Sequence, residues 1–190
     1  GEAVGFISSL KGRAIIISVD GSKRPAKVRM RVFRGDRIET DFRAKIQLYF
    51  PDYSTVSISG SSDFTIKSYI FDAEKREGAL HGKIEDGALH FMAGEIKKIA
   101  PQNYKIETST AVIGIRGSSG QVVTTSGKLP DTTPQTVVMK TGGKGITANI
   151  LGRPPLNDIK KTGSGRIIKE EKPSDVKRIS SSPLTEYDSK

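Results

Sequence analysis

The feature that most constrains this chain is a rhythm of short segments, rich in apolar residues and separated by turn signals. Residues 27–32 alternate strictly, with Val28, Met30 and Val32 on one side and basic residues on the other. An alternation of period two places each set of side chains on one face of a β-strand. Turn signals recur about every 8–12 residues, which is typical of antiparallel sandwiches and barrels. The rhythm predicts an all-β protein.

Two dipeptides indicate hairpins. Asp20-Gly21 follows the β-branched residues 14–19, and residues 27–32 are expected to form the returning strand. Asp86-Gly87 predicts a second hairpin, because Asp-Gly accepts the positive φ angles of a tight turn. No convincing amphipathic helix is found, and residues 72–79 are expected to form a loop or a single turn. Further strands are predicted at residues 45–50, 55–59, 63–70, 82–85, 88–92, 94–99, 104–108, 136–140 and 146–151.

The amino-acid composition of the chain changes near residue 124. Thr, Ser, Gly and Pro dominate residues 124–135, and apolar residues become sparse after Pro154-Pro155. We therefore expect one folded domain over residues 1–165. Residues 166–190 are expected to form an extended or flexible C-terminal tail, poor in structure.

Composition excludes several classes of protein. The 190 residues include no cysteine, so disulfides, thiolate nucleophiles and Cys-ligated metals are excluded. No apolar run approaches the roughly 18 residues of a membrane helix. Because the chain begins with Gly1 and not Met, we expect a processed product whose targeting segment was removed. Attachment to a membrane would then need a removed or separate anchor.

Short motifs recur in a fixed order along the first two thirds of the chain. They are Val4-Gly5, Gly12-Arg13-Ala14, Arg34-Gly35-Asp36-Arg37-Ile38-Glu39-Thr40, Leu48-Tyr49-Phe50-Pro51-Asp52-Tyr53-Ser54, Gly94-Glu95-Ile96, Tyr104-Lys105-Ile106-Glu107-Thr108 and Ala111-Val112-Ile113-Gly114-Ile115-Arg116-Gly117-Ser118. Together they resemble the FecR domain, from residue 1 to about 125 and more weakly to about 165. The resemblance implies an antiparallel, jelly-roll-like β-sandwich in the periplasm or another extracytoplasmic space, and it does not imply an enzyme.

Four of the motif residues have a predicted structural role. Gly35 can adopt a positive φ, and the Asp36 carboxylate can accept backbone N–H bonds in the same turn. A ligand-binding role for Asp36 is the alternative. Arg116, followed by Gly117, lies in an otherwise apolar segment, and its guanidinium can bridge carboxylates. We expect it to clamp strand ends through Asp36 or Asp52.

A group of basic residues is the feature that most suggests a binding surface. Lys27, Arg29 and Arg31 would project from one face of the predicted strand at about 6–7 Å spacing, and Arg34 continues the charge. The stripe could bind an acidic protein surface or an anionic polymer. It could also be an ordinary solvated face, or protect a strand edge from aggregation.

Catalytic and cofactor sites are hard to assemble from these residues. His81 and His90 are the only histidines, and zinc normally needs three or four protein ligands. The run 117–120 does not match the Gly-x-Ser-x-Gly nucleophile elbow. The tail mixes both charges, and no reading helix or aromatic platform for nucleic acid is evident. We therefore expect no metal, no cofactor and no nucleic-acid partner.

These observations favour a non-catalytic, extracytoplasmic interaction domain. Its expected partners are proteins of a cell-envelope sensing or scaffolding assembly, and a homo-oligomer or a larger complex is compatible with that role. Binding of an anionic cell-wall or surface polysaccharide through Arg29 and Arg31 is the alternative. A glycan-acting enzyme is the least favoured of the three, because nothing in the sequence pairs the scattered carboxylates.

Overall fold

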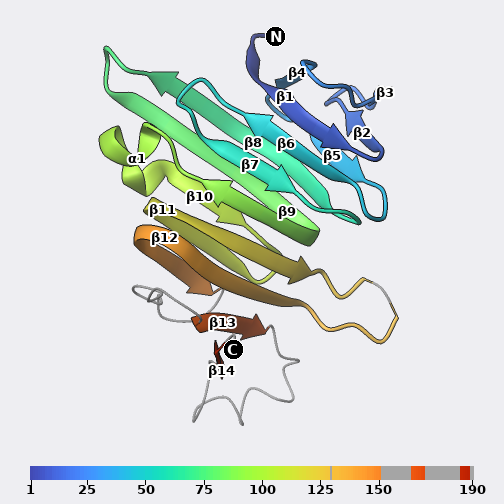
Figure 1. Ribbon diagram of the computed structural model, residues 1–190, viewed down its shortest axis with the longest axis vertical. Helices are drawn as coiled ribbons and strands as arrows, with labels where there is room; N and C mark the ends of the chain where they lie inside the picture. The colour runs from blue at the N-terminus through green and yellow to red at the C-terminus, as the bar shows by residue number, and fades with distance from the viewer. Residues whose placement is uncertain (129, 151–163, 170–184, 189–190) are drawn as a thin grey trace.

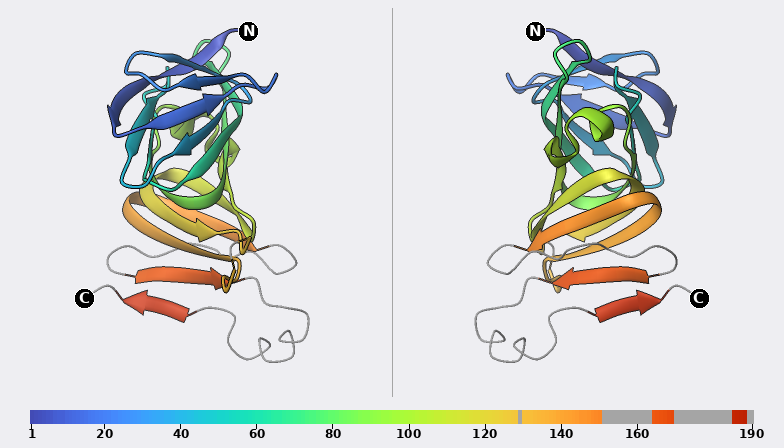
Figure 2. Two further views of the ribbon diagram at one scale, coloured as in Figure 1. Left: turned by 90° about the vertical axis from the view of Figure 1, so that its right-hand side faces the viewer. Right: turned by 90° about the vertical axis from the view of Figure 1, so that its left-hand side faces the viewer.

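A computed structural model of the chain describes residues 1–128, 130–150, 164–169 and 185–188. The described strands form one sheet of 14 strands, which curls strongly around a single hydrophobic core (Figures 1 and 2). All pairings are antiparallel except that of β9 with β10. The prediction of an all-β antiparallel protein is thus confirmed.

The elements follow one another with short connections over most of the chain. They are β1 (Ala3–Lys11), β2 (Ala14–Ile17), β3 (Lys23–Pro25), β4 (Arg31–Phe33), β5 (Arg37–Thr40), β6 (Lys45–Tyr49), β7 (Thr55–Ile58), β8 (Asp63–Asp72), β9 (Glu77–Met92), α1 (Ile96–Ile99), the 3-10 helix η1 (Pro101–Asn103), β10 (Tyr104–Glu107), β11 (Ala111–Thr125), β12 (Gln135–Ile150), β13 (Ser164–Lys169) and β14 (Thr185–Asp188).

The long strand β9 joins two arms of the sheet. Its first part pairs with β8, which continues through β5 and β2 to β3. Its last part pairs with β7, which continues through β6 and β1 to β4. Because both arms are hydrogen-bonded to the same strand, the two layers remain parts of one curled sheet.

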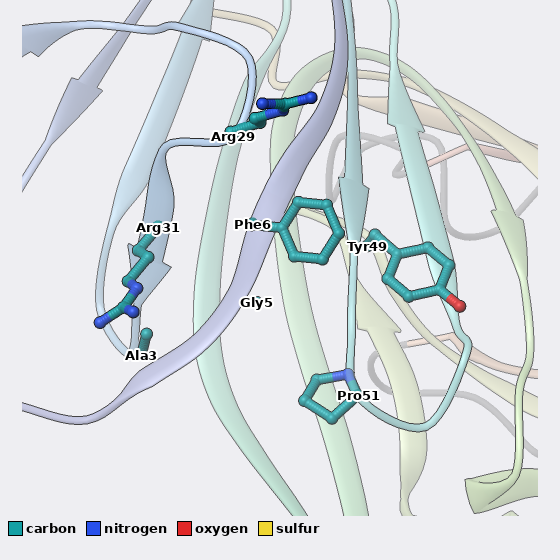
Figure 3. A pocket seen from close by; sticks show the side chains of 7 residues that line it. All are labelled: Ala3, Gly5, Phe6, Arg29, Arg31, Tyr49 and Pro51. Atoms are coloured by element: carbon teal, nitrogen blue, oxygen red, sulfur yellow. The ribbon is translucent and has the colours of Figure 1, made fainter.

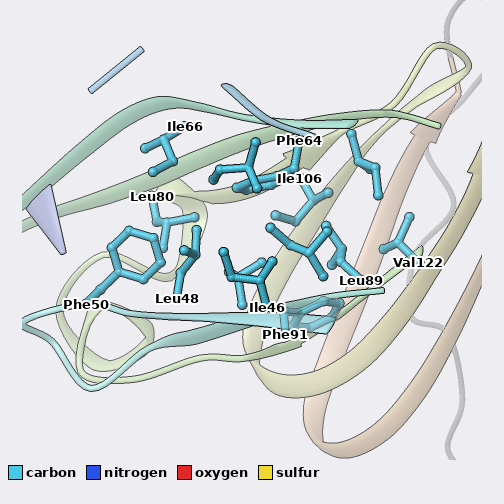
Figure 4. Packing of buried hydrophobic residues seen from close by; sticks show 14 of the residues in the cluster. Ile46, Leu48, Phe50, Phe64, Ile66, Leu80, Leu89, Phe91, Ile106 and Val122 are labelled. Atoms are coloured by element: carbon cyan, nitrogen blue, oxygen red, sulfur yellow. The ribbon is translucent and has the colours of Figure 1, made fainter. Parts of the chain in front are cut away.

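The core lies between the two arms, as Figure 4 shows. Ile46, Leu48 and Phe91 enter it from the β4 arm and its continuation in β9, whereas Phe64 and Ile66 enter from the β8 side. All five side chains are at most 1% exposed. The burial follows the alternation that predicted these strands, because every second residue of a pleated strand points to the same face.

The second predicted hairpin is wrong, because β9 runs through Asp86-Gly87 without turning back. Gly87 has a φ of 101°. A Cβ at this position would lie 2.6 Å from the Cα of Ser62, so only glycine allows the approach. The dipeptide therefore serves a bend, at which β9 passes from one arm to the other, and the predicted strands 82–85 and 88–92 form a single element.

Two further segments differ from the sequence prediction. Residues 94–99, expected to form a strand, contain the short helix α1, which packs the fully buried Ile96 into the core. Residues 136–140 and 146–150 belong to one strand, β12, which pairs with β11 along its whole length, including Gly142 and Gly143. Strand pairing thus continues through the glycine pair, where the sequence had suggested a break between two strands.

Most of the chain after residue 150, including residue 151 of a predicted strand and most of the predicted tail, lies outside the described residues. The strands β13 and β14 extend the sheet beyond β12, with β13 lying across position 165. The division into residues 1–165 and 166–190 stays a prediction. Within the described residues, no helix combines the length and the apolar character needed to cross a bilayer.

Candidate functional site

The predicted basic strand at residues 27–32 is wrong in its first half. The hairpin at Asp20-Gly21 forms, but its returning strand is β3, and residues 27–30 make a turn closed by the Met30 N–H and the Lys27 carbonyl. The Arg29 N–H donates to the Ile7 carbonyl at 2.8 Å, which fastens the turn to β1. Val28 is 51% exposed, whereas Met30 packs against the core, so the two residues do not share one buried face as a strand would require.

Pairing across three strands places one basic and two aromatic residues in a row. Arg31 of β4 lies opposite Phe6 of β1, and Phe6 lies opposite Tyr49 of β6. The centroids of the Phe6 and Tyr49 rings are 5.4 Å apart. A Cβ on Gly5 would come within 2.6 Å of the Tyr49 carbonyl oxygen, so the close approach of β1 to β6 requires glycine there.

These side chains surround an open hollow of about 350 Å³ on the outer face of the sheet, which we term the Arg29–Arg31 hollow. Figure 3 shows the Phe6 and Tyr49 rings on one side of Gly5 and Arg31 on the other. The side chain of Phe6 is 41% exposed. The lining consists of Ala3, Gly5, Phe6, Arg29, Arg31, Tyr49 and Pro51.

The electrostatics of the hollow are positive. Arg29 and Arg31 are both exposed, and neither side chain forms an ion pair or a hydrogen bond within the described part of the chain. A second hollow of about 410 Å³ shares Ala3 and Pro51 with the first and is lined by three acidic residues and one lysine. The two adjoining hollows therefore differ in the sign of their charge.

The other two predicted binding residues lie elsewhere. Lys27 is exposed in the turn before β4, and Arg34 is exposed in the turn after it. Neither lines the Arg29–Arg31 hollow. The turn at residues 27–30 interrupts the alternation that would have placed all four basic side chains on one face. Only Arg29 and Arg31 therefore line the same hollow.

Asp36 performs the turn chemistry expected of it. Its carboxylate accepts the Phe33 N–H at 3.0 Å, and Gly35 before it has a φ of 86°. The side chain of Asp36 is 2% exposed and forms an ion pair with Arg24, whose Nη2 lies 2.6 Å from Oδ2. Arg24 also lies over the ring of Phe33, 5.3 Å from its centroid.

Arg116 does not form the expected clamp. The carboxylate of Asp36 is held by Arg24, and Asp52 is held by Ser54 and Tyr69. The side chain of Arg116 is exposed on β11, and Gly117 follows it in the same strand. The alternation of β11 explains this, since Ile115 is fully buried and its neighbour must point outward.

A buried polar network connects the turn after β6 with the segment around α1. The fully buried Asp52 accepts hydrogen bonds from the Tyr69 hydroxyl at 2.9 Å and the Ser54 hydroxyl at 2.6 Å. The Ile96 N–H donates to the same carboxylate. Burial, and next the charge of Asp52, raise the pKa of Tyr69 and of the fully buried Tyr104 above the usual range of a phenol. The network stabilises the fold.

The two histidines do not come together as metal ligands. Both lie on β9, with His81 Nε2 3.0 Å from a Glu107 oxygen and His90 Nε2 3.3 Å from the Thr141 hydroxyl. Burial, and next the cation of Lys45, lower the pKa of His90. Among the residues that the structure describes, no group of three or more His, Asp or Glu side chains could hold a metal ion.

Sequence reasoning missed the aromatic half of the site. Phe6 lies far along the chain from Tyr49 and the 65% exposed Tyr53, yet the Tyr49 ring is 5.4 Å from the ring of Phe6. The Tyr49 ring is also 6.4 Å from that of Tyr53, four residues further on. The available signal was that Tyr53 stands in a turn, where an aromatic residue has little reason to be buried. The neighbouring positions of Phe6 and Tyr49 follow only from strand register.

A model of the family "FecR protein" matches residues 36–139, which is more than half of the chain. The chain belongs to the FecR family. The resemblance seen in the sequence motifs is thereby confirmed, and FecR proteins form a non-catalytic family. The match includes β5 to β11 and leaves Arg29, Arg31 and Phe6 outside it. No curated protein matches this FecR chain.

Solved structures of two proteins are similar to the chain. A protein from Parabacteroides distasonis, described provisionally as an anti-sigma factor, is 11% identical with a TM-score of 0.51 in structures at 1.65 and 2.50 Å resolution. The match covers 80% of this chain and 59% of that protein, and at this identity it shows the fold alone. A structure described as a cell surface anchoring domain is 32% identical, covers 33% of this chain and 83% of its own, and has a TM-score of 0.32.

Proposed function

We propose that this FecR domain is a non-catalytic, extracytoplasmic interaction module, which binds a protein partner in a cell-envelope sensing or scaffolding assembly. Its two arms would act as the layers of the jelly-roll-like sandwich that the sequence suggests, and carry binding residues on their outer faces. Control of a sigma factor would be one form of that signalling. Membership in the FecR family is the observation that carries the proposal.

The distribution of polar groups supports this function. The buried polar side chains that we describe, such as Asp36 and Asp52, are engaged in turns and strand contacts that hold the fold. The concave side of the curled sheet is filled by the hydrophobic core. The outer surface, with its exposed aromatic and basic side chains, is therefore the part of the domain that remains for binding.

Binding of an anionic polysaccharide is the second candidate. The formal charge of +10 favours association with polyanions. This function predicts cosedimentation with cell-wall material, weakening steeply with salt because surface charges are screened. The double variant Arg29→Glu with Arg31→Glu should then lose the interaction, and retained binding would exclude these residues as the polymer site.

The protein-binding function can be tested in cells. The precursor encoded by the gene is fused to alkaline phosphatase, which is active only after export, and a photo-crosslinking residue replaces Tyr53, Gln121 or Lys105 in turn. All three positions are exposed; Tyr53 follows β6, Lys105 lies on β10 and Gln121 on β11. An exported fusion and a crosslink to one defined protein are expected. A fusion that stays in the cytoplasm, or crosslinks to glycan alone, would contradict the proposal.

A further inference from the structure

We propose that the Arg29–Arg31 hollow docks a short extended segment of a partner protein, in which a carboxylate side chain neighbours an apolar one. The inference rests on the protein-binding function proposed above and names its site and the chemistry of its partner. Two properties of the hollow carry it: an apolar lining, and two arginines without a carboxylate partner in the described chain.

The lining suits an apolar side chain. Five of the residues around the hollow, Ala3, Gly5, Phe6, Tyr49 and Pro51, contribute carbon surface or bare backbone. Phe6 leaves two fifths of its side chain in solvent, although it lies next to a second ring. A volume of about 350 Å³ is at the small end of ligand sites, which fits one or two side chains and not a folded surface.

The two arginines suit a carboxylate at the margin of the same hollow. A guanidinium binds a carboxylate through two parallel N–H donors, and this geometry is stronger than a single neutral hydrogen bond. Two arginines of the other arm are engaged, Arg24 with Asp36 and Arg37 with Asp63. Arg29 and Arg31 have no such partner among the described residues, so their charge is available to an incoming anion.

Backbone conformation makes the role of Arg29 testable apart from the fold. Arg29 has a φ of 69° and Tyr53 a φ of 68°, the left-handed region that side chains other than glycine occupy at a cost of about 1–2 kcal/mol. Arg29 lines the hollow, and the ring of Tyr53 lies 6.4 Å from that of Tyr49, which also lines it. Glycine would relieve the backbone at both positions, so each side chain can be removed there without a cost to folding.

The surroundings favour a peptide segment over a polyanion. Tyr49 and the two arginines supply all the side-chain hydrogen-bonding groups of the lining, few for the many hydroxyls of a sugar chain. Past Ala3 and Pro51, the adjoining hollow presents Glu2, Asp72 and Glu77 beside one lysine. A uniform polyanion continuing in that direction would meet carboxylates, whereas a protein segment can place a neutral or basic residue there.

The test uses nuclear magnetic resonance of the labelled chain with three probes. They are a blocked hexapeptide Ser-Glu-Leu-Glu-Thr-Ser, its counterpart with Gln in place of both Glu, and a tetramer of galacturonic acid. The acidic peptide should shift the amide signals of residues 5–6, 29–31 and 49, and the Gln peptide should bind at least about tenfold more weakly. An absence of shifts up to about 5 mM acidic peptide would overturn the inference.

Glycine variants separate binding from folding. Arg29→Gly and Tyr53→Gly relieve a positive φ, so their thermal midpoints should stay within a few degrees of the parent or rise. Arg29→Gly should nevertheless weaken binding of the acidic peptide at least about tenfold. Arg43→Gly is the matched control, because Arg43 also has a positive φ, of 61°, and does not line the hollow. Equal losses in Arg29→Gly and Arg43→Gly would refute the assignment.

The remaining outcomes distinguish this inference from the function on which it rests. Tighter binding of the galacturonic acid tetramer than of the acidic peptide at these signals would overturn the inference in favour of a glycan. A protein crosslinked in cells through Gln121 or Lys105, with no effect of Arg29→Gly on its yield, would leave the proposed function intact and place the partner elsewhere. A yield that falls with Arg29→Gly and not with Arg43→Gly supports the inference.

Discussion

Replacing Arg24 with methionine should lower the free energy of unfolding by about 2–3 kcal/mol, because it leaves a buried carboxylate without its cation. The Asp36 side chain is 2% exposed, and its Oδ2 lies 2.6 Å from Arg24 Nη2. Removing one partner of a buried ion pair costs about 3–5 kcal/mol. We expect less here, since Arg24 is 31% exposed and water screens part of the interaction.

A double-mutant cycle isolates the contribution of the pair. Asp36→Asn should cost about 1–2 kcal/mol, because it keeps an oxygen for the Phe33 N–H and Arg24 can reach solvent. The double variant should cost less than the sum, with a coupling of about 1–2 kcal/mol. Urea unfolding measures these values, and the thermal midpoint of Arg24→Met should fall by roughly 4–12 °C.

The control is Arg116→Met, at the exposed arginine that the sequence had suggested for this role. It should change the free energy of unfolding by less than about 0.5 kcal/mol, as surface substitutions generally do. The reasoning would be refuted if Arg24→Met stayed within that range, or if Arg116→Met destabilised the domain more than Arg24→Met does.

Two further predictions concern a pair of tyrosines and the bend in β9. The folded state raises the pKa of Tyr69 and Tyr104, so the free energy of unfolding should be unaffected below pH 10 and fall above it by about 1.4 kcal/mol per pH unit for each tyrosine. Tyr69→Phe should halve that slope when urea unfolding is measured across this pH range. An unchanged slope in the variant would contradict the prediction. Gly87→Ala should cost about 3 kcal/mol or more, since it adds a clash with Ser62 to a φ of 101°. Gly21→Ala, at a φ of 83° with nothing within 4 Å of the new Cβ, should cost only about 1 kcal/mol. Urea unfolding of the two variants measures both costs, and equal losses would show that the clash is not decisive.

Much of the fold could be predicted because several strands carry their information locally. In β6 and β7, buried apolar residues such as Ile46, Leu48 and Val56 recur at every second position, so the pattern indicates both the strand and its inner face. The turn at Asp20-Gly21 is equally local. The Asp86-Gly87 dipeptide looks the same in sequence, yet it forms a bend within β9. The residues before it pair with β8 and those after it pair with β7, so the strand continues from one arm to the other.

Only the basic residues of the candidate site could be predicted, because they lie close together in the sequence whereas its aromatic residues do not. Arg29 and Arg31 stand out as a local run of charge, and the structure places both at one hollow. Lys27 does not line that hollow, because residues 27–30 form a turn and not the expected strand. The turn is hydrogen-bonded to Ile7 of β1. Phe6 and Tyr49 could not be found, since their contact depends on the register between β1 and β6 and on a glycine that lets the strands approach.

The amino-acid sequence alone determined that this chain folds into strands, which of their faces are apolar, and that it is a FecR domain, because these properties depend on residues close together in the chain. Tertiary structure decided which arginine neutralises Asp36, where β9 bends, and which aromatic rings meet Arg29 and Arg31. Such pairings join residues distant in the chain, and their energies depend on burial and register that arise only when the two arms of the sheet close over one core.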